Sequence, residues 1–303
     1  MQENNMPKQR LCFAIFGNVY QQHKAAAVRQ LLDCLARHDA QVFIDEEFHD
    51  FLISLGILEG GERSGRAEFS DFADIPHCDF AISMGGDGTL LKTAHRVGSS
   101  ETPILGVNMG RLGFLADVSA SDIEAGIDAL YQGDYSVEKR ALIQVSDSTG
   151  PLTDGQALND VAILKRDTAS MISIRTSING EYLTTYQADG LIISTPTGST
   201  AYSLSNGGPI IVPGTGVMLL TPVAPHSLNV RPIVIPGSSE VEVTVSSRSH
   251  TFLVAVDGRS LKMPEGTTLR LARAPYVARI VKRSGTRYFT TLREKMMWGA
   301  DIR

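Results

Sequence analysis

The first 132 residues alternate between short apolar runs and stretches with helical periodicity, and this alternation restricts the fold more than any other feature. The apolar runs predict strands at Leu11–Phe16, Gln41–Ile44, Asp79–Met84 and Pro103–Val107. Helices are predicted at about 22–38, 46–56, 90–98 and 121–132, with a Gly-, Glu- and Ser-rich loop at 57–71. Such alternation predicts a parallel sheet covered by helices, with ligands at the carboxyl ends of its strands.

From about residue 136 the pattern changes to β-branched residues that alternate with polar ones between turns. Strands are expected at Met171–Ile178, Ile233–Ile235, Val241–Val245 and Thr251–Val256, the last followed by an Asp257-Gly258 turn. The sequence therefore predicts an α/β N-terminal domain over 1–138 and a β-rich C-terminal domain over 139–303. The end of the chain, about 287–303, could return to the first domain.

Composition excludes several classes of protein. Of the 303 residues, 28 are Lys or Arg and 33 are Asp or Glu, which gives a formal net charge of −5 without any basic block. A general nucleic-acid binder needs clustered cations, so that class is not expected. No run reaches the length of a membrane span. The three cysteines, Cys12, Cys34 and Cys78, are far apart in sequence, which predicts reduced thiols, a cytoplasmic location and no structural zinc.

A glycine-rich turn joins the third predicted strand to the helix that follows it. Gly85-Gly86-Asp87-Gly88-Thr89 comes directly after the apolar run and opens a stretch with helical spacing that ends at Gly98. Backbone N–H groups and the positive end of a helix dipole form a natural phosphate seat there. A carboxylate among the glycines would repel phosphate unless it binds a metal or takes a proton from a substrate hydroxyl. Helix capping by Asp87 is the simpler alternative.

A hydroxyl-rich segment, Ser194–Ser205, follows the apolar run at 191–193 and ends before Gly207-Gly208-Pro209. Short hydroxyl side chains and a glycine after a strand let a ligand approach the backbone, and Tyr202 adds a flat face on which a ring could stack. A Ser/Thr-rich surface turn explains the same composition.

Together these segments resemble the bacterial NAD kinase family. The resemblance rests on the GGDGT loop at 85–89, Asn108–Ala116, Asn159-Asp160, Asp189–Tyr202 and Pro225–Leu228 with Arg231-Pro232, in the family's order. The loop alone is the weaker sign, because lipid kinases and phosphofructokinases have similar loops. The family usually has Asn-Glu where this chain has Asn159-Asp160, and the shorter Asp side chain puts ligand distances there in question.

The resemblance implies a two-domain NAD kinase-like fold and a phosphotransferase that moves the γ-phosphoryl group of ATP to the 2′-hydroxyl of the adenosine ribose of NAD, giving NADP. It implies Asp87 as the general base, Mg²⁺ arriving with ATP rather than on fixed protein ligands, and a homodimer or homotetramer. The ligand-binding residues that it implies are Asp87, Gly88, Lys92, Asn159, Asp160, Asp189, Thr197, Thr200, Ala201, Tyr202, Ser203, Leu204, Ser205 and Arg259.

Several of these residues have a plain structural alternative in the sequence. Lys92 could be a solvent-facing lysine, Asp189 a structural carboxylate before a strand, and Arg259 an exposed turn arginine. Two other functions also stay open: a kinase with a GGDGT loop that acts on a lipid or sugar, and a non-catalytic NAD(H)-sensing module. The hydroxyl-rich segment favours a dinucleotide over the first, and Asp87 argues against the second.

Overall fold

The structure of the protein is a computed structural model that describes residues 10–19, 25–58, 66–75, 77–110, 113–166, 170–283, 285 and 288–299. The chain divides into two compact units, residues 1–138 with 279–303, and residues 139–278. The chain thus re-enters the first unit at residue 279, earlier than the sequence suggested. Among the described residues, no helix combines the length and the apolar character needed to span a bilayer.

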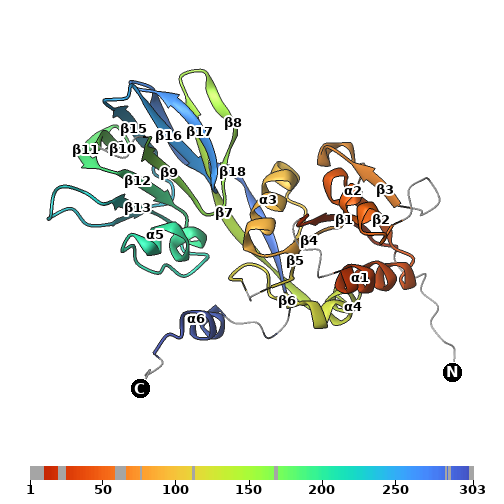
Figure 1. Ribbon diagram of the computed structural model, residues 1–303. Coiled ribbons are helices and arrows are strands. Elements are labelled where there is room, and N and C mark those ends of the chain that lie inside the picture. Colours follow the sequence, from red (N-terminus) through yellow and green to blue (C-terminus); the bar gives the residue numbers. More distant parts are fainter. Residues whose placement is uncertain are drawn as a thin grey trace. The chain divides into compact units, whose positions relative to one another are not determined.

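The first unit is built on a parallel sheet in the order β3-β2-β1-β4-β5, with the end of β18 beside β5 (Figure 1). Its strands are β1 (Cys12–Gly17), β2 (Gln41–Asp45), β3 (Arg66–Phe69), β4 (Phe80–Gly85), β5 (Ile104–Asn108) and the two-residue β6 (Val118–Ser119). The helices are α1 (Ala25–Arg37), α2 (Glu46–Ser54), α3 (Asp87–Val97), α4 (Ile123–Gln132) and α6 (Tyr288–Met296). The predicted parallel α/β fold is confirmed.

Alternating side chains decide which helices cover each face of this sheet. Large residues of β1 and β4, such as Phe13 and Ile82, share one apolar cluster with buried residues of α1, α2 and α4. The opposite face carries small residues, among them Ala14, Ala81 and Gly106. A Cβ on Gly106 would lie 2.8 Å from Leu90 Cδ1, so this glycine lets α3 pack close to β5.

One prediction in this unit was wrong. The segment 57–71 was expected to be a loop, but β3 forms at Arg66–Phe69 and pairs in parallel with β2. This edge strand has a single neighbour and no apolar run, so its sequence carries little strand signal. The predicted start of the first helix, at 22–24, lies outside the described residues.

The second unit consists of antiparallel sheets with one shared apolar cluster. One sheet has the order β14-β13-β12-β9-β16-β17, and the other contains β11-β10-β15-β18 with the β7–β8 pair joined to β18. The strands are β7 (Tyr135–Asp147), β8 (Gly150–Ala157), β9 (Asp160–Lys165), β10 (Ile172–Ile178), β11 (Glu181–Ala188), β12 (Gly190–Ser194), β13 (Val217–Val223), β14 (Ile233–Pro236), β15 (Val241–Ser246), β16 (Thr251–Val256), β17 (Arg259–Pro264) and β18 (Thr268–Arg283). Its one described α-helix, α5 (Tyr202–Ser205), is a single turn. The predicted β-rich domain is confirmed.

Candidate functional site

The glycine-rich turn lies at the carboxyl end of β4, where it passes directly into α3. Gly85 must lack a side chain because an added Cβ would lie 2.1 Å from Thr89 Oγ1. Gly86 is the N-cap, and Asp87 is the first residue of the helix. The first N–H groups and the positive dipole end of α3 therefore lie at the edge where a parallel α/β sheet binds its ligands.

The carboxylate of Asp87 does not cap its own helix. It accepts three hydrogen bonds from consecutive backbone N–H groups instead: from Phe114 to Oδ2 (2.6 Å), and from Leu115 and Ala116 to Oδ1 (3.0 and 3.3 Å). Gly113 makes this arrangement possible, because a Cβ there would lie 1.8 Å from Asp87 Oδ1. Asp87 thus joins the glycine-rich turn to the segment 113–116. The sequence shows the order of these two motifs along the chain but not their contact.

Open space surrounds the rest of the turn. A Cβ built on Gly86 or Gly88 meets no protein atom within 4 Å, and Gly88 is exposed. Lys92, one turn further along α3, is also exposed, which agrees with the alternative that it is a solvent-facing lysine. Arg111 and Leu112 of the neighbouring motif lie outside the described residues.

Two lysines from the C-terminal part of the chain lie beside this segment, and the sequence interpretation missed both. Lys282 is 6% exposed, donates to the Leu115 carbonyl (3.0 Å) and pairs with Asp117 (3.4 Å). Lys295 of α6 has its Nζ 4.6 Å from the centroid of the Phe114 ring. A lysine at an inward position of an apolar strand, as in Ile280-Val281-Lys282, was the signal that could have identified the first of them.

In the second unit, Asp257 holds the predicted Asn159-Asp160 motif in place. Its carboxylate accepts from the backbone N–H groups of Leu158 (2.7 Å), Asn159 (2.8 Å) and Asp160 (3.1 Å). Its own N–H donates to the Asp160 carbonyl (3.0 Å). The sequence interpretation assigned Asp257 only to a turn. The turn is present, with φ of 46° at Asp257 and 82° at Gly258, but the carboxylate also makes it a support of the motif.

Asp160 is buried next to this second carboxylate. Burial, and after it the negative charge of Asp257, raises the pKa of Asp160 to about 7, although a hydrogen bond from the Tyr202 backbone opposes the shift. Burial also raises the pKa of Asp257, against the effect of the three N–H donors and the charge of Arg259. In both carboxyl groups the raised pKa favours the protonated form.

The hydroxyl-rich segment divides into groups that hold the fold together and groups that remain accessible. Ser194, Thr195, Ser199 and Ser203 are buried and bonded internally. Thr195 Oγ1 donates to the Leu158 carbonyl (2.6 Å), and a Cβ on Gly198 would lie 2.1 Å from the Asn159 carbonyl oxygen. The segment is thereby packed directly against the Asn159-Asp160 motif.

The predicted pocket residues differ in exposure accordingly. Tyr202 is 41% exposed, which leaves its ring available for stacking, and Ser205 is also exposed. Thr200, Ala201 and Leu204 are partly exposed. Thr197 is 8% exposed, with its Oγ1 3.4 Å from the Arg140 guanidinium, whereas Ser203 is fully buried against Thr221 (2.8 Å). The sequence placed Ser203 in the pocket wall, but its hydroxyl is engaged inside the fold.

The last two predicted residues have partners of their own. Asp189 pairs with Lys165 (2.7 Å), which fits the structural alternative. Arg259 donates to the carbonyls of Gln156 (2.9 Å) and Asp154 (3.3 Å). The interpretation of Arg259 as an exposed turn residue was wrong, because the side chain is partly buried and braces the end of β8.

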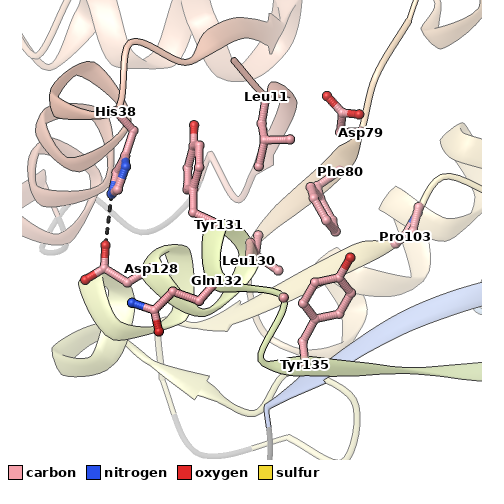
Figure 2. A pocket seen from close by; sticks show the side chains of 11 residues that line it. Leu11, His38, Asp79, Phe80, Pro103, Asp128, Leu130, Tyr131, Gln132 and Tyr135 are labelled. Carbon is pink, nitrogen blue, oxygen red and sulfur yellow. Dashed lines mark hydrogen bonds and ion pairs between the residues drawn. The ribbon is translucent and has the colours of Figure 1, made fainter. Parts of the chain in front are cut away.

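A cavity of about 720 Å³ lies within the first unit, at the opposite end of the strands from Asp87. Leu11, Phe80 and Pro103 line it where β1, β4 and β5 begin, as Figure 2 shows. His38 stacks on Tyr131 there and contacts the Asp128 carboxylate (2.9 Å). Ligands of parallel α/β sheets bind at the carboxyl ends of the strands, so this cavity is not the candidate site.

Comparison with known proteins gives a consistent result over both units. Residues 13–135 match the model of the ATP-NAD kinase N-terminal domain, and residues 158–283 match that of the C-terminal domain. The chain is 53% identical to the NAD kinase of Bacteroides fragilis over 294 residues, which is 96% of this chain and 99% of the relative. It is 42% identical to the NAD kinase of Porphyromonas gingivalis over 291 residues, again 96% and 99% of the two chains.

Solved structures have the same fold. The structure of yeast NADH kinase complexed with NADH aligns with a TM-score of 0.87 at 21% identity, over 100% of this chain and 94% of that one. The structure of an NAD kinase from Archaeoglobus fulgidus in complex with ATP aligns with a TM-score of 0.73 at 24% identity, over 95% and 99%. Two family models and near-full-length relatives thus show that the chain belongs to the ATP-NAD kinase family.

Proposed function

We propose that this chain transfers the γ-phosphoryl group of ATP to the 2′-hydroxyl of the adenosine ribose of NAD, with Asp87 as the general base. The 2′-oxygen forms a bond to the γ-phosphorus, the bond from that phosphorus to the bridging oxygen breaks, and ADP leaves. The hydroxyl proton passes to Asp87. A ribose hydroxyl is a weak nucleophile at neutral pH, so a base in hydrogen-bonding reach contributes about 10²–10⁴-fold.

The observation that carries this proposal is a fixed carboxylate, that of Asp87, at the N-terminus of α3 beside open space at Gly86 and Gly88. An ionised carboxylate offers about four lone-pair positions. Backbone N–H groups fill two on Oδ1 and one on Oδ2, which leaves one position on Oδ2 for a substrate hydroxyl. The three donors hold both oxygens in place, so the base is fixed before the substrate binds.

The phosphate groups need positive charge that a chain of net charge −5 supplies only locally. The N-terminus of α3 and the open backbone at Gly86 and Gly88 are suited to the triphosphate. Mg²⁺ is expected with the nucleotide, where it would neutralise the phosphate oxygens. The residues fit such an ion: both carboxylate oxygens of Asp117 are buried without a hydrogen-bond donor among the described residues. Because Lys282 already pairs with Asp117 (3.4 Å), the ion is still expected to arrive with ATP, held by phosphate and water oxygens.

We assign the nucleoside parts of NAD to the second unit. Asn159 and Asp160 would contact the ribose and adenine, because an amide both donates and accepts while a carboxyl group complements a hydroxyl or amine. Tyr202 supplies a partly exposed ring for stacking. Thr197, Thr200, Ala201, Leu204 and Ser205 would form the pocket wall, and Ser203 would support it from inside.

A reconstitution assay tests the proposal. Purified protein with NAD, ATP and Mg²⁺ should form NADP, detected with an NADP-specific dehydrogenase, and omission of any component should abolish the product. Product only with polyphosphate, or phosphorylation only of a lipid or sugar, would assign a different donor or acceptor. Binding of NAD with no product from any donor would favour the sensing module. Size-exclusion chromatography with light scattering tests the expected dimer or tetramer, and cell fractionation tests the cytoplasmic location.

The Asp87→Asn variant tests the base. Its turnover should fall by at least about 10²-fold, while NAD binding, which we assign to the second unit, persists. Loss of charged acceptors for three N–H groups should also lower the free energy of unfolding by about 1–3 kcal/mol. Asp50→Asn, an exposed change on α2, is the matched control and should alter neither quantity. Turnover by Asp87→Asn within about threefold of the parent would refute the assignment.

A further inference from the structure

Two lysines from the C-terminal part of the chain, Lys282 and Lys295, lie beside the segment that holds Asp87. They differ in the hydrogen bonds that their ammonium groups make. Lys282 donates to the Leu115 carbonyl and pairs with Asp117. It therefore has a structural role that accounts for its burial.

Among the described residues, Lys295 has no comparable hydrogen-bond or ion-pair partner. Its Nζ is buried and makes no hydrogen bond among the residues that the structure describes, and it lies over the face of the Phe114 ring. The N–H of the same Phe114 donates to Asp87 Oδ2, the oxygen that keeps a position for substrate. Lys295 thus lies beside Asp87, the proposed base, and its N–H groups make no hydrogen bond to the described residues.

The charges around Lys295 show what it could bind. Burial, and to a smaller extent the charge of Lys282, lowers the pKa of Lys295 to about 8, while Asp87, Asp117 and Glu294 oppose the shift. A cation–π contact offsets only part of the cost of burying an ammonium group. An anion with several oxygens would complete its hydrogen bonds, as a lysine does in many phosphate sites.

We propose that Lys295 is a further functional residue of this site, one that donates to phosphate oxygens of the nucleotide bound at the Asp87 turn. The inference rests on the proposed function and names the group that meets the triphosphate. As the bond between the γ-phosphorus and the bridging oxygen breaks, negative charge grows on the departing β-phosphate. Lys295 keeps its proton throughout and offsets that charge, while Asp87 takes the proton of the hydroxyl.

Matched variants separate this role from packing. Lys295→Met keeps the length and the apolar contact with Phe114 but removes the charge, and Lys295→Arg keeps the charge. Lys262→Met, an exposed position on β17, controls for loss of one positive charge. For Lys295→Met we expect kcat/KM for ATP to fall by about 10²-fold or more, with KM for NAD within twofold and the thermal midpoint not lowered. The kcat/KM for ATP of Lys295→Arg should be at least tenfold higher than that of Lys295→Met.

A second measurement does not depend on turnover. Calorimetric titration with inorganic tripolyphosphate should show binding to the parent and at least tenfold weaker binding to Lys295→Met, or to Lys295→Gln if the Met variant does not fold. Equal tripolyphosphate binding, or turnover within threefold of the parent, would overturn the role of Lys295. A parent that forms no NADP but binds tripolyphosphate through Lys295 would refute the proposed function and leave only phosphate binding by Lys295 supported.

Discussion

Replacing Asp160 with Asn should stabilise the protein at neutral and alkaline pH, because the replacement removes a buried ionisation. Burial and Asp257 raise the pKa of Asp160 from 3.8 to about 7. Each pKa unit corresponds to about 1.36 kcal/mol, so the shift of about 3 units amounts to about 4 kcal/mol between the two charge states. The Asn amide has nearly the same shape, and its oxygen can still accept from the Tyr202 backbone.

The direction in which stability changes with pH follows from the raised pKa of Asp160. Folding favours the protonated carboxyl group, so its contribution to stability is complete below the unfolded-state pKa near 3.8 and is lost as the pH rises through about 7. Between pH 5 and pH 8 the parent should lose about 2–3 kcal/mol of unfolding free energy from this group. The Asp160→Asn variant should lose none of it.

Urea unfolding of both proteins at pH 5, 6, 7 and 8 measures this difference. The unfolding free energy of the variant minus that of the parent should grow by about 2–3 kcal/mol over the series, most of it below pH 7.5. Glu181→Gln, an exposed change on β11, should give a difference that does not vary with pH. A constant difference for Asp160→Asn would show that Asp160 ionises as readily in the folded protein as in the unfolded chain.

Three further substitutions use the space around the site. In Gly88→Ala the new methyl group meets no protein atom within 4 Å, and alanine favours helix α3 by about 1 kcal/mol over glycine. If the triphosphate occupies this space, the KM for ATP should rise while stability does not fall. An unchanged KM would show that the triphosphate lies elsewhere. Gly113→Ala should reduce kcat at least about 10²-fold by displacing Asp87; near-parental kcat would show that the carboxylate position matters little. Tyr202→Ala should raise KM for NAD roughly 2- to 10-fold through the loss of stacking, and an unchanged KM would place its ring outside the pocket.

The sequence predicted strands with a continuous apolar run, such as β1, β4 and β5, and strands with regular alternation, such as β15 and β16, but not the edge strand β3. β1, β4 and β5 are continuous apolar runs because neighbouring strands and helices enclose them. β3 at Arg66–Phe69 lies at the sheet edge and looks like a loop in sequence. Edge strands depend on backbone pairing with one neighbour, which local composition does not record.

For the candidate site, the sequence located the motifs but did not show which of their residues are buried and which are accessible to a ligand. Seven hydroxyl residues stand close together in Ser194–Ser205, and nothing in their order indicates that Ser199 and Ser203 are buried while Thr200 is partly exposed. The segment folds as a 3-10 turn followed by one turn of α-helix, so neither helical nor strand periodicity applies to it. Asp257 and Gly113 matter through contacts with residues far away in sequence, which a single chain of letters cannot show.

Asp87 and Asp257 show that one arrangement can serve two purposes. Each carboxylate accepts from three consecutive backbone N–H groups, those of residues 114–116 and of residues 158–160. The arrangement by itself therefore indicates a fixed loop and not a reacting group. The surroundings separate the two: Asp87 opens a helix beside open space at Gly86 and Gly88, whereas Asp257 lies next to the buried carboxyl group of Asp160. The open space at the first suits an incoming phosphate and hydroxyl, which is why we propose proton transfer by Asp87 and support of the motif by Asp257.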